Sequence, residues 1–121
     1  MRKPNVFVTM LGLTLAVPAF AAELSTPTLF KGGTNSQNVC VATNVGTKPV
    51  NLTVRMVTFS GGTTEEDCTI PPGDPSGCQN FANDLAYCQV VVQGSAKNVR
   101  AVMMNRDIVS PFTINATVDA R

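Results

Sequence analysis

Four cysteines are the residues of this chain with the clearest chemistry: Cys40, Cys68, Cys78 and Cys88. None of them forms a C-x-x-C motif, the spacing typical of zinc knuckles and thioredoxin-type redox sites. The sequence also contains no histidine, the side chain that completes most nucleophilic triads and the commonest zinc and copper ligand. We therefore expect the cysteines to form two disulfide bonds, and we expect no catalytic residue, cofactor or metal site.

The densest group of carboxylates is Glu65-Glu66-Asp67. Such a group could bind calcium or supply a carboxylate pair for acid–base catalysis. Three consecutive acids cannot all face one point, and the D-x-D ladder of a calcium loop is missing. We therefore expect an exposed loop over residues 61–67. A small metal-binding protein or hydrolase that uses the acids at 65–67 is the alternative.

Three methionines could suggest a copper(I) site, because thioether sulfur is a soft ligand: Met56, Met103 and Met104. Met56 lies on the apolar face of an expected strand. Met103 and Met104 are adjacent, so at most one of them can face a core. We expect core filling instead.

The chain has no tryptophan and one tyrosine, Tyr87, which disfavours a carbohydrate-binding surface built on flat aromatic rings.

Residues 1–21 have the three parts of a secretory signal peptide. Arg2 and Lys3 supply the positive charge, residues 6–17 are mostly apolar, and Ala19-Phe20-Ala21 fits a signal peptidase site. The apolar run is too short to span a bilayer comfortably, which disfavours a retained membrane anchor. We expect a mature domain over residues 22–121, secreted or periplasmic, where disulfides persist.

The charge of the expected mature chain disfavours two classes of partner, nucleic acid and anionic lipid. Removal of Arg2 and Lys3 lowers the nine basic side chains to seven, against eight acidic ones. A near-neutral domain without a basic cluster has no electrostatic basis for binding nucleic acid. No second apolar run is long enough for a membrane span in the mature chain. A protein or cell-surface partner, unknown from the sequence, is what we expect.

Period-2 alternation is the main structural signal. In residues 50–60, Val50, Leu52, Val54 and Met56 alternate with more polar side chains, as in a half-buried strand. Further strands are expected within 24–30, 37–44, 68–70, 78–81, 87–93, 98–104 and 111–119, with turns at 44–49 and 105–107 and a corner at 82–85. In 37–44, valines 39 and 41 share one face, and Cys40 and Ala42 the other. No helical periodicity runs for three turns, so we expect one all-β domain.

These elements resemble a known family. The turn Asn44-Val-Gly46, the alternating Val50/Leu52/Val54, the segment Ile70-Pro-Pro-Gly73 and the run Tyr87-Cys-Gln-Val-Val-Val92 are similar to immunoglobulin-like modules of bacterial secreted proteins. The most similar kind is CARDB, the cell-adhesion-related domain in bacteria, over residues 39–93. The cysteines and the chain's ending depart from that family. The resemblance implies an immunoglobulin-like antiparallel β-sandwich of about seven strands and transfers no catalytic residue.

Within such a sandwich the expected disulfides are Cys40–Cys88 and Cys68–Cys78. Cys40 and Cys88 lie in an early and a late strand that would face each other across the core. Cys68 and Cys78 bracket the loop at 71–77, which is rich in proline and glycine. The pairing Cys40–Cys68 with Cys78–Cys88 stays possible if the last two lie in a hairpin.

A non-enzymatic role fits these observations best. We expect a structural or binding module of the cell envelope or the extracellular space. A pilus-type subunit that donates or accepts a strand is a second alternative beside the metal-binding protein or hydrolase.

Overall fold

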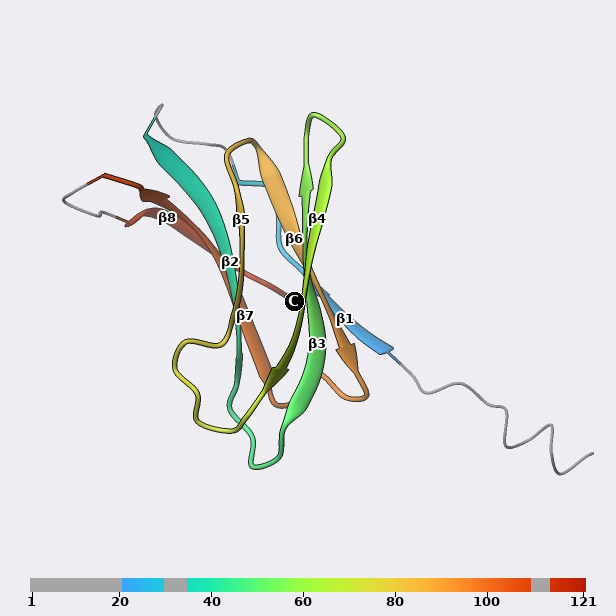
Figure 1. Ribbon diagram of the computed structural model, residues 1–121. Helices are drawn as coiled ribbons and strands as arrows, with labels where there is room; N and C mark the ends of the chain where they lie inside the picture. The colour runs from blue at the N-terminus through green and yellow to red at the C-terminus, as the bar shows by residue number, and fades with distance from the viewer. Residues whose placement is uncertain (1–20, 30–34, 110–113) are drawn as a thin grey trace, which may run out of the picture.

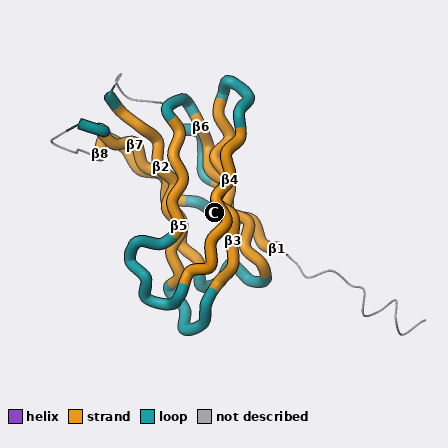
Figure 2. Tube along the Cα trace, in the orientation of Figure 1, coloured by secondary structure: helices purple, strands orange, loops and turns teal. Residues whose placement is uncertain are grey.

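The computed structural model describes residues 21–29, 35–109 and 114–121. Eight β-strands lie in this part of the chain and form two four-stranded antiparallel sheets, packed face to face (Figure 1). No helix occurs among the described residues (Figure 2). The first sheet has the order β1-β6-β3-β4 and the second the order β5-β2-β7-β8; we call them sheet A and sheet B. The strands are β1 (Ala21–Ser25), β2 (Ser36–Asn44), β3 (Val50–Thr58), β4 (Thr63–Ile70), β5 (Cys78–Ala82), β6 (Ala86–Gln93), β7 (Val99–Asp107) and β8 (Ile114–Asp119). The fold is the expected antiparallel β-sandwich.

The core lies between the two sheets and follows the alternation of the strands. Every second side chain of β2, β3, β6 and β7 is buried there. Met56 and Met103 are both fully buried in this core, whereas Met104 lies on the opposite face of β7. The prediction that these methionines fill the core, with only one of the adjacent pair facing inward, is confirmed.

Both expected disulfides are present. Cys40 on β2 is bonded to Cys88 on β6, with 6.2 Å between their Cα atoms. Cys68 on β4 is bonded to Cys78 on β5, with 6.0 Å between their Cα atoms. Because β4 belongs to sheet A and β5 to sheet B, the second bond does more than close the loop at 71–77. Each disulfide joins one sheet to the other.

Hydrogen bonds connect the sheets along both of their sides. On the side of β4 and β5, the Asn80 amide Nδ2 donates to the carbonyl oxygens of Val54 (2.9 Å) and Thr64 (3.0 Å). On the side of β1 and β8, Ser25 and Arg121 exchange two backbone bonds of 2.9 and 3.0 Å. The edges of the two sheets are therefore linked at these points.

One end of the interior is polar. The buried Asn38 donates through Nδ2 to the carbonyl oxygens of Leu29 (3.0 Å) and Asp84 (2.8 Å). Its Oδ1 accepts a bond of 2.8 Å from Asn105, which accepts in turn from Asn115 at 3.1 Å. Buried amides need such partners, because an unpaired polar group in the interior is costly. The Asn38 side chain therefore holds the segments around Leu29 and Asp84 in place.

The turn at 44–49 is held by its first residue. The buried Asn44 side chain donates to the carbonyl oxygens of Lys48 (2.6 Å) and Ile70 (2.9 Å), and its Oδ1 accepts from the Gly46 N–H (2.9 Å). Gly46 packs directly on Asn98, whose side chain lies 2.8 Å from where a Cβ would stand. The sharp turn expected from the sequence is confirmed.

Several expected element bounds are wrong. The segment at 61–67 is not a loop throughout, because β4 begins at Thr63 and pairs with β3 as far as Ile70. Residues 105–107 do not turn but continue β7, where Asn105 faces the interior. The first strand is Ala21–Ser25 rather than a segment of 24–30. Residues 1–20, 30–34 and 110–113, with most of the expected signal peptide, lie outside the described residues.

Candidate functional site

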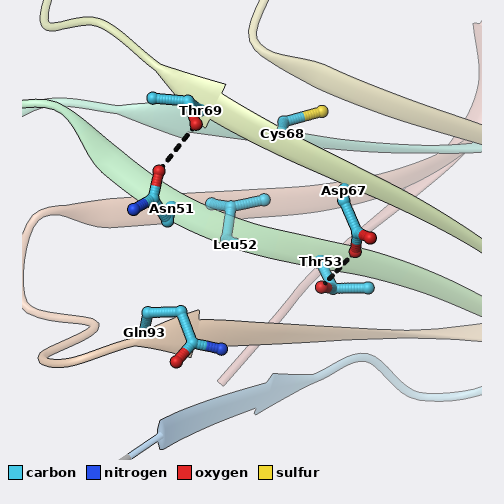
Figure 3. Close-up of a pocket in the computed structure, with 7 residues that line it drawn as sticks. All are labelled: Asn51, Leu52, Thr53, Asp67, Cys68, Thr69 and Gln93. Atoms are coloured by element: carbon cyan, nitrogen blue, oxygen red, sulfur yellow. Dashed lines mark hydrogen bonds between the residues drawn. The ribbon is translucent and has the colours of Figure 1, made fainter.

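The outer face of sheet A carries two of the three acids that the sequence singled out, Glu65 and Asp67. Across β3 and β4, the Thr69 hydroxyl donates to Asn51 Oδ1, and the Thr53 hydroxyl donates to Asp67 Oδ1, each at 2.6 Å (Figure 3). One step further along, Arg55 forms an ion pair of 2.6 Å with Glu65. These are pairs of side chains directly opposite each other in the β3–β4 register, the arrangement that stabilises neighbouring strands.

The three acids do not converge. Glu65 and Asp67 lie on the outer face of β4, whereas Glu66 is opposite the core residue Val54 and points to the other side of the strand. No group of three or more potential metal-ligating side chains is arranged to hold an ion in the described part of the chain. The absence of a tight metal site from the whole protein stays a prediction.

A shallow depression of about 370 Å³ lies over this polar pattern. Figure 3 shows Asn51 facing Thr69 and Thr53 facing Asp67, with Gln93 on the neighbouring strand β6. Within each of the two pairs, the polar groups are thus bonded to each other. The depression is lined by no group that would act as an activated nucleophile. We interpret it as a polar surface whose paired side chains already hydrogen-bond to one another.

The outer face of sheet B is different, because apolar side chains occupy its middle. Val39 points away from the core and is nevertheless only 1% exposed. In the register it lies between Phe81 of β5 and Met104 of β7. Val41 and Val102 are opposite each other in the adjacent row and are half-buried. We call the set Val39, Val41, Phe81, Val102 and Met104 the apolar face.

An arginine lies at one border of the apolar face, next to Phe81. The Arg106 guanidinium is 5.6 Å from the centre of the Phe81 ring, within the range of a cation–π contact. Its buried Nε has no hydrogen-bond partner among the described residues. Phe81 is still 41% exposed, and Ile114, which is opposite Arg106 in the register, is 58% exposed. This border therefore combines a cation with uncovered apolar surface.

The opposite border of the apolar face, next to Val41 and Val102, is hollowed. A pocket of about 360 Å³ has Val41 and Val102 in its lining, and charged residues of both signs: Arg100, Asp119 and Arg121. Apolar lining with a few polar groups around it is the common composition of a binding surface. This face therefore combines apolar area with a charged border, a composition suited to a partner.

The sequence contained only part of the signal for this face. Valines 39 and 41 were expected to share one face of their strand, opposite Cys40 and Ala42, and they do. A strand that is apolar on both faces indicates cover on both sides. Phe81, Val102 and Met104 come from β5 and β7, which pair with β2 from distant parts of the chain. Only the register reveals that these residues meet.

Comparisons with known proteins give information about the fold and none about the function. No family model matches the chain, and no curated protein matches it. Among solved structures, the crystal structure of Thermotoga maritima 1070 is similar, with a TM-score of 0.53 and 11% sequence identity. The similarity covers 82% of this chain and 91% of that one. At this identity it shows a shared arrangement of strands. No helix among the described residues is long and apolar enough to cross a membrane.

Proposed function

We propose that this protein is a secreted or periplasmic β-sandwich module without enzymatic activity, which binds a protein or cell-surface partner through the apolar face. The immunoglobulin-like class and the resemblance to the CARDB type are part of this proposal. Two disulfides and the expected signal peptide support a place outside the cytosol, in the cell envelope or the extracellular space.

The contrast between the two outer faces carries the proposal. On sheet A, polar side chains are paired with one another across the strands. On sheet B, apolar side chains cover the middle, and Phe81 remains 41% exposed beside Arg106. Aromatic residues and arginine are enriched where proteins contact each other, and exposed apolar patches often mark such sites. The partner would therefore cover sheet B and leave sheet A in water.

A matched pair of valines tests the proposal. Val41 lies on the outer face of sheet B and Val91 on the outer face of sheet A, and both are half-buried on a central strand. The purified protein is photo-cross-linked in the native extracellular or periplasmic fraction, and the products are identified by mass spectrometry. We expect Val41→Glu to lose the captured partner and Val91→Glu to keep it.

The same experiment can contradict the proposal. Equal capture by both variants would exclude the apolar face as the binding surface. Loss of capture by Val91→Glu alone would move the site to sheet A. Non-reducing peptide mapping of each variant checks that the two native disulfides have formed, so that a folding defect is not mistaken for lost binding.

The alternative functions have less support. For a hydrolase or metal-binding protein at 65–67, Glu65 and Asp67 would have to leave Arg55 and Thr53, and Glu66 faces the other side of β4. For a pilus-type subunit, a missing strand would be expected, whereas each sheet has four strands of this chain and the sheets are linked on both sides.

A further inference from the structure

The outer edge of β8 is open for most of its length. In an antiparallel ladder, alternate residues bond to the neighbouring strand, and those between them turn their N–H and C=O groups away. The Ala120 N–H donates to Ala101 of β7, whereas Arg121 exchanges its two bonds with Ser25 on the other side. By this alternation, Thr117 and Asp119 also present their backbone groups to the free side of β8.

No described segment covers this edge. The side chains at 114–117 are all exposed, and β8 pairs with β7 alone. An open pocket separates Val118 and Asp119 from the chain at Ser25, Thr26 and Pro27. A strand placed beside Thr117 would therefore meet solvent and unpaired backbone groups.

The other edge strands of the described residues are protected in ways that β8 is not. Strands β4 and β5 are held against each other by the Cys68–Cys78 bond and by Asn80. Strand β4 also carries three acids, and β1 carries Glu23. Charges and covered edges are the usual means by which proteins prevent strands from pairing between molecules. From Ile114 to Val118, β8 has no charge and consists mostly of residues with high or neutral strand propensity.

We propose that β8 pairs with β8 of a second copy of this chain, antiparallel about a two-fold axis at Thr117. In that register the two Thr117 residues exchange two N–H···O bonds, and Ala116 lies opposite Val118. Asn115, at the bulge of β8, lies opposite Asp119; its Nδ2 already donates to Asn105 and Asp107 of its own chain. No like charges face each other, whereas β4 paired with its own copy would bring the carboxylates at 65–67 together. The charge pattern of β8 is thus compatible with itself.

Such a dimer would join the two copies of sheet B into one continuous eight-stranded sheet. The proposal does not depend on the proposed function, because pairing along the edge leaves the apolar face uncovered. It would place two apolar faces side by side on the same surface. A partner with two equivalent binding segments would then bind more tightly than a partner with one, through effective concentration.

Sedimentation velocity over a wide range of protein concentration tests this pairing with the full secreted protein. We expect a monomer–dimer equilibrium. Thr117→Pro should weaken the dimer by about tenfold or more, because it removes the N–H at the axis. That N–H faces away from β7, so the fold should tolerate proline there. Thr117→Val is the matched control; it keeps the N–H and should dimerise as the wild type does.

A second variant covers the case in which Thr117→Pro fails to fold. Directly bonded residues of antiparallel strands have Cα atoms about 5.5 Å apart, within reach of a disulfide. Thr117→Cys should therefore give a dimer linked through position 117 under mild oxidation. A wild type that stays monomeric at all concentrations, or a Thr117→Pro dimer as tight as the wild type, would overturn the proposal. So would the absence of the 117–117 link, or β8 pairing only with a different protein.

Val41→Glu separates the two proposals. This variant should keep the dimer, because Val41 lies on the face of sheet B and not at its edge. Thr117→Pro should keep cross-linking of a partner to the apolar face. Failure of one proposal is therefore visible without failure of the other.

Discussion

Gly77 lies at the residue before β5, where the chain passes very close to β2. Its φ of 60° is in the left-handed region that favours glycine. A Cβ at this position would overlap the carbonyl oxygen of Ala42. Gly73, in the same loop, has a φ of 79° and nothing within 4 Å of its Cβ position. The two glycines share a left-handed backbone conformation but differ in the space around them.

This difference gives a matched prediction. Gly73→Ala should cost about 1 kcal/mol of unfolding free energy, which is the strain of a positive φ alone. Gly77→Ala should cost about 3 kcal/mol or more, because β2 must also move away from the new methyl group. Urea denaturation monitored by circular dichroism measures both costs. Equal costs would show that the contact with Ala42 relaxes freely.

Asp74 in the same loop has a lowered pKa. The cause is hydrogen bonding to its Oδ1 from the Ser76 hydroxyl (2.7 Å) and from the Ser76 N–H (2.9 Å). A carboxyl whose pKa is depressed by folding stabilises the protein above its unfolded value of 3.8, and this contribution disappears as pH falls through the folded value. The stabilisation from Asp74 should therefore be fully present at neutral pH and be lost only as the pH falls below 3.8.

Replacement of Ser76 tests the cause of this shift. In Ser76→Ala the hydroxyl donor is lost and the backbone donor remains, so the pKa of Asp74 should rise toward its ordinary value without reaching it. NMR titration of the Asp74 carboxyl carbon measures the change. Identical titration curves for the variant and the wild type would contradict the role given to the hydroxyl.

The buried amide of Asn38 is the third feature at this scale. It bonds to the carbonyl oxygens of Leu29 and Asp84 and to the Asn105 amide. Asn38→Ala should cost about 2–4 kcal/mol, because it leaves these buried groups without a partner. Gln37→Ala is the control, since its bond to Asn83 of 3.3 Å is exposed. Chemical denaturation of both variants decides, and a similar small cost for each would mean that water replaces the Asn38 amide.

At the scale of elements, the two disulfides are distinguished by the chain that they enclose. Cys40–Cys88 spans 48 residues and Cys68–Cys78 spans 10. By the chain-entropy estimate, the longer loop should give about 1.4 kcal/mol more stability. Replacing Cys40 and Cys88 by alanine also leaves a void, because both sulfurs are fully buried.

We therefore expect Cys40→Ala/Cys88→Ala to be less stable than Cys68→Ala/Cys78→Ala by more than about 1 kcal/mol. Thermal unfolding of the two double variants gives the order. The reverse order would indicate that linking the edges β4 and β5 matters more than the length of the loop.

The strands that the sequence predicted well are those with alternating apolar residues. β3 and β6 bury every second side chain, and the amino-acid sequence shows this alternation directly. β4 was missed over the acids, because its side chains are exposed and it is stabilised by partners on β3 instead of by a buried face. The end of β7 was missed because Asn105, Arg106 and Asp107 are residue types common in turns. Their partners, such as Asn38, lie far away in the sequence.

The candidate site was predictable to a smaller extent. The lack of histidine and of a C-x-x-C motif is read directly from the sequence, whereas the absence of an active site stays a prediction. The disulfide pairing was expected from the cross-sheet bond of immunoglobulin-like sandwiches. The apolar face needed the register of β2 with β5 and β7, which links residues up to about seventy positions apart. The open edge of β8 depends on which neighbours a strand lacks, and no local pattern contains that information.

At the scale of the whole molecule, the expected signal peptide leads to a prediction about the first strand. β1 begins at Ala21, which pairs with Gln93 of β6. Cleavage after Ala21 would leave Ala22 as the first residue and keep four of the five residues of β1. Intact-mass measurement of the exported protein should show this N-terminus. A mature protein that still contains Met1 would contradict the prediction.

The spacing of the cysteines also affects how the molecule reaches its oxidised state. Cys78 is ten residues from its native partner Cys68 and equally far from Cys88, which belongs to the other bond. In an unfolded chain, loops of equal length close at similar rates. Early oxidation should therefore produce the mistaken bond 78–88 about as often as the correct bond 68–78. The native pair is selected only when β4 and β5 come together, so efficient maturation depends on thiol–disulfide exchange and on an environment that permits it.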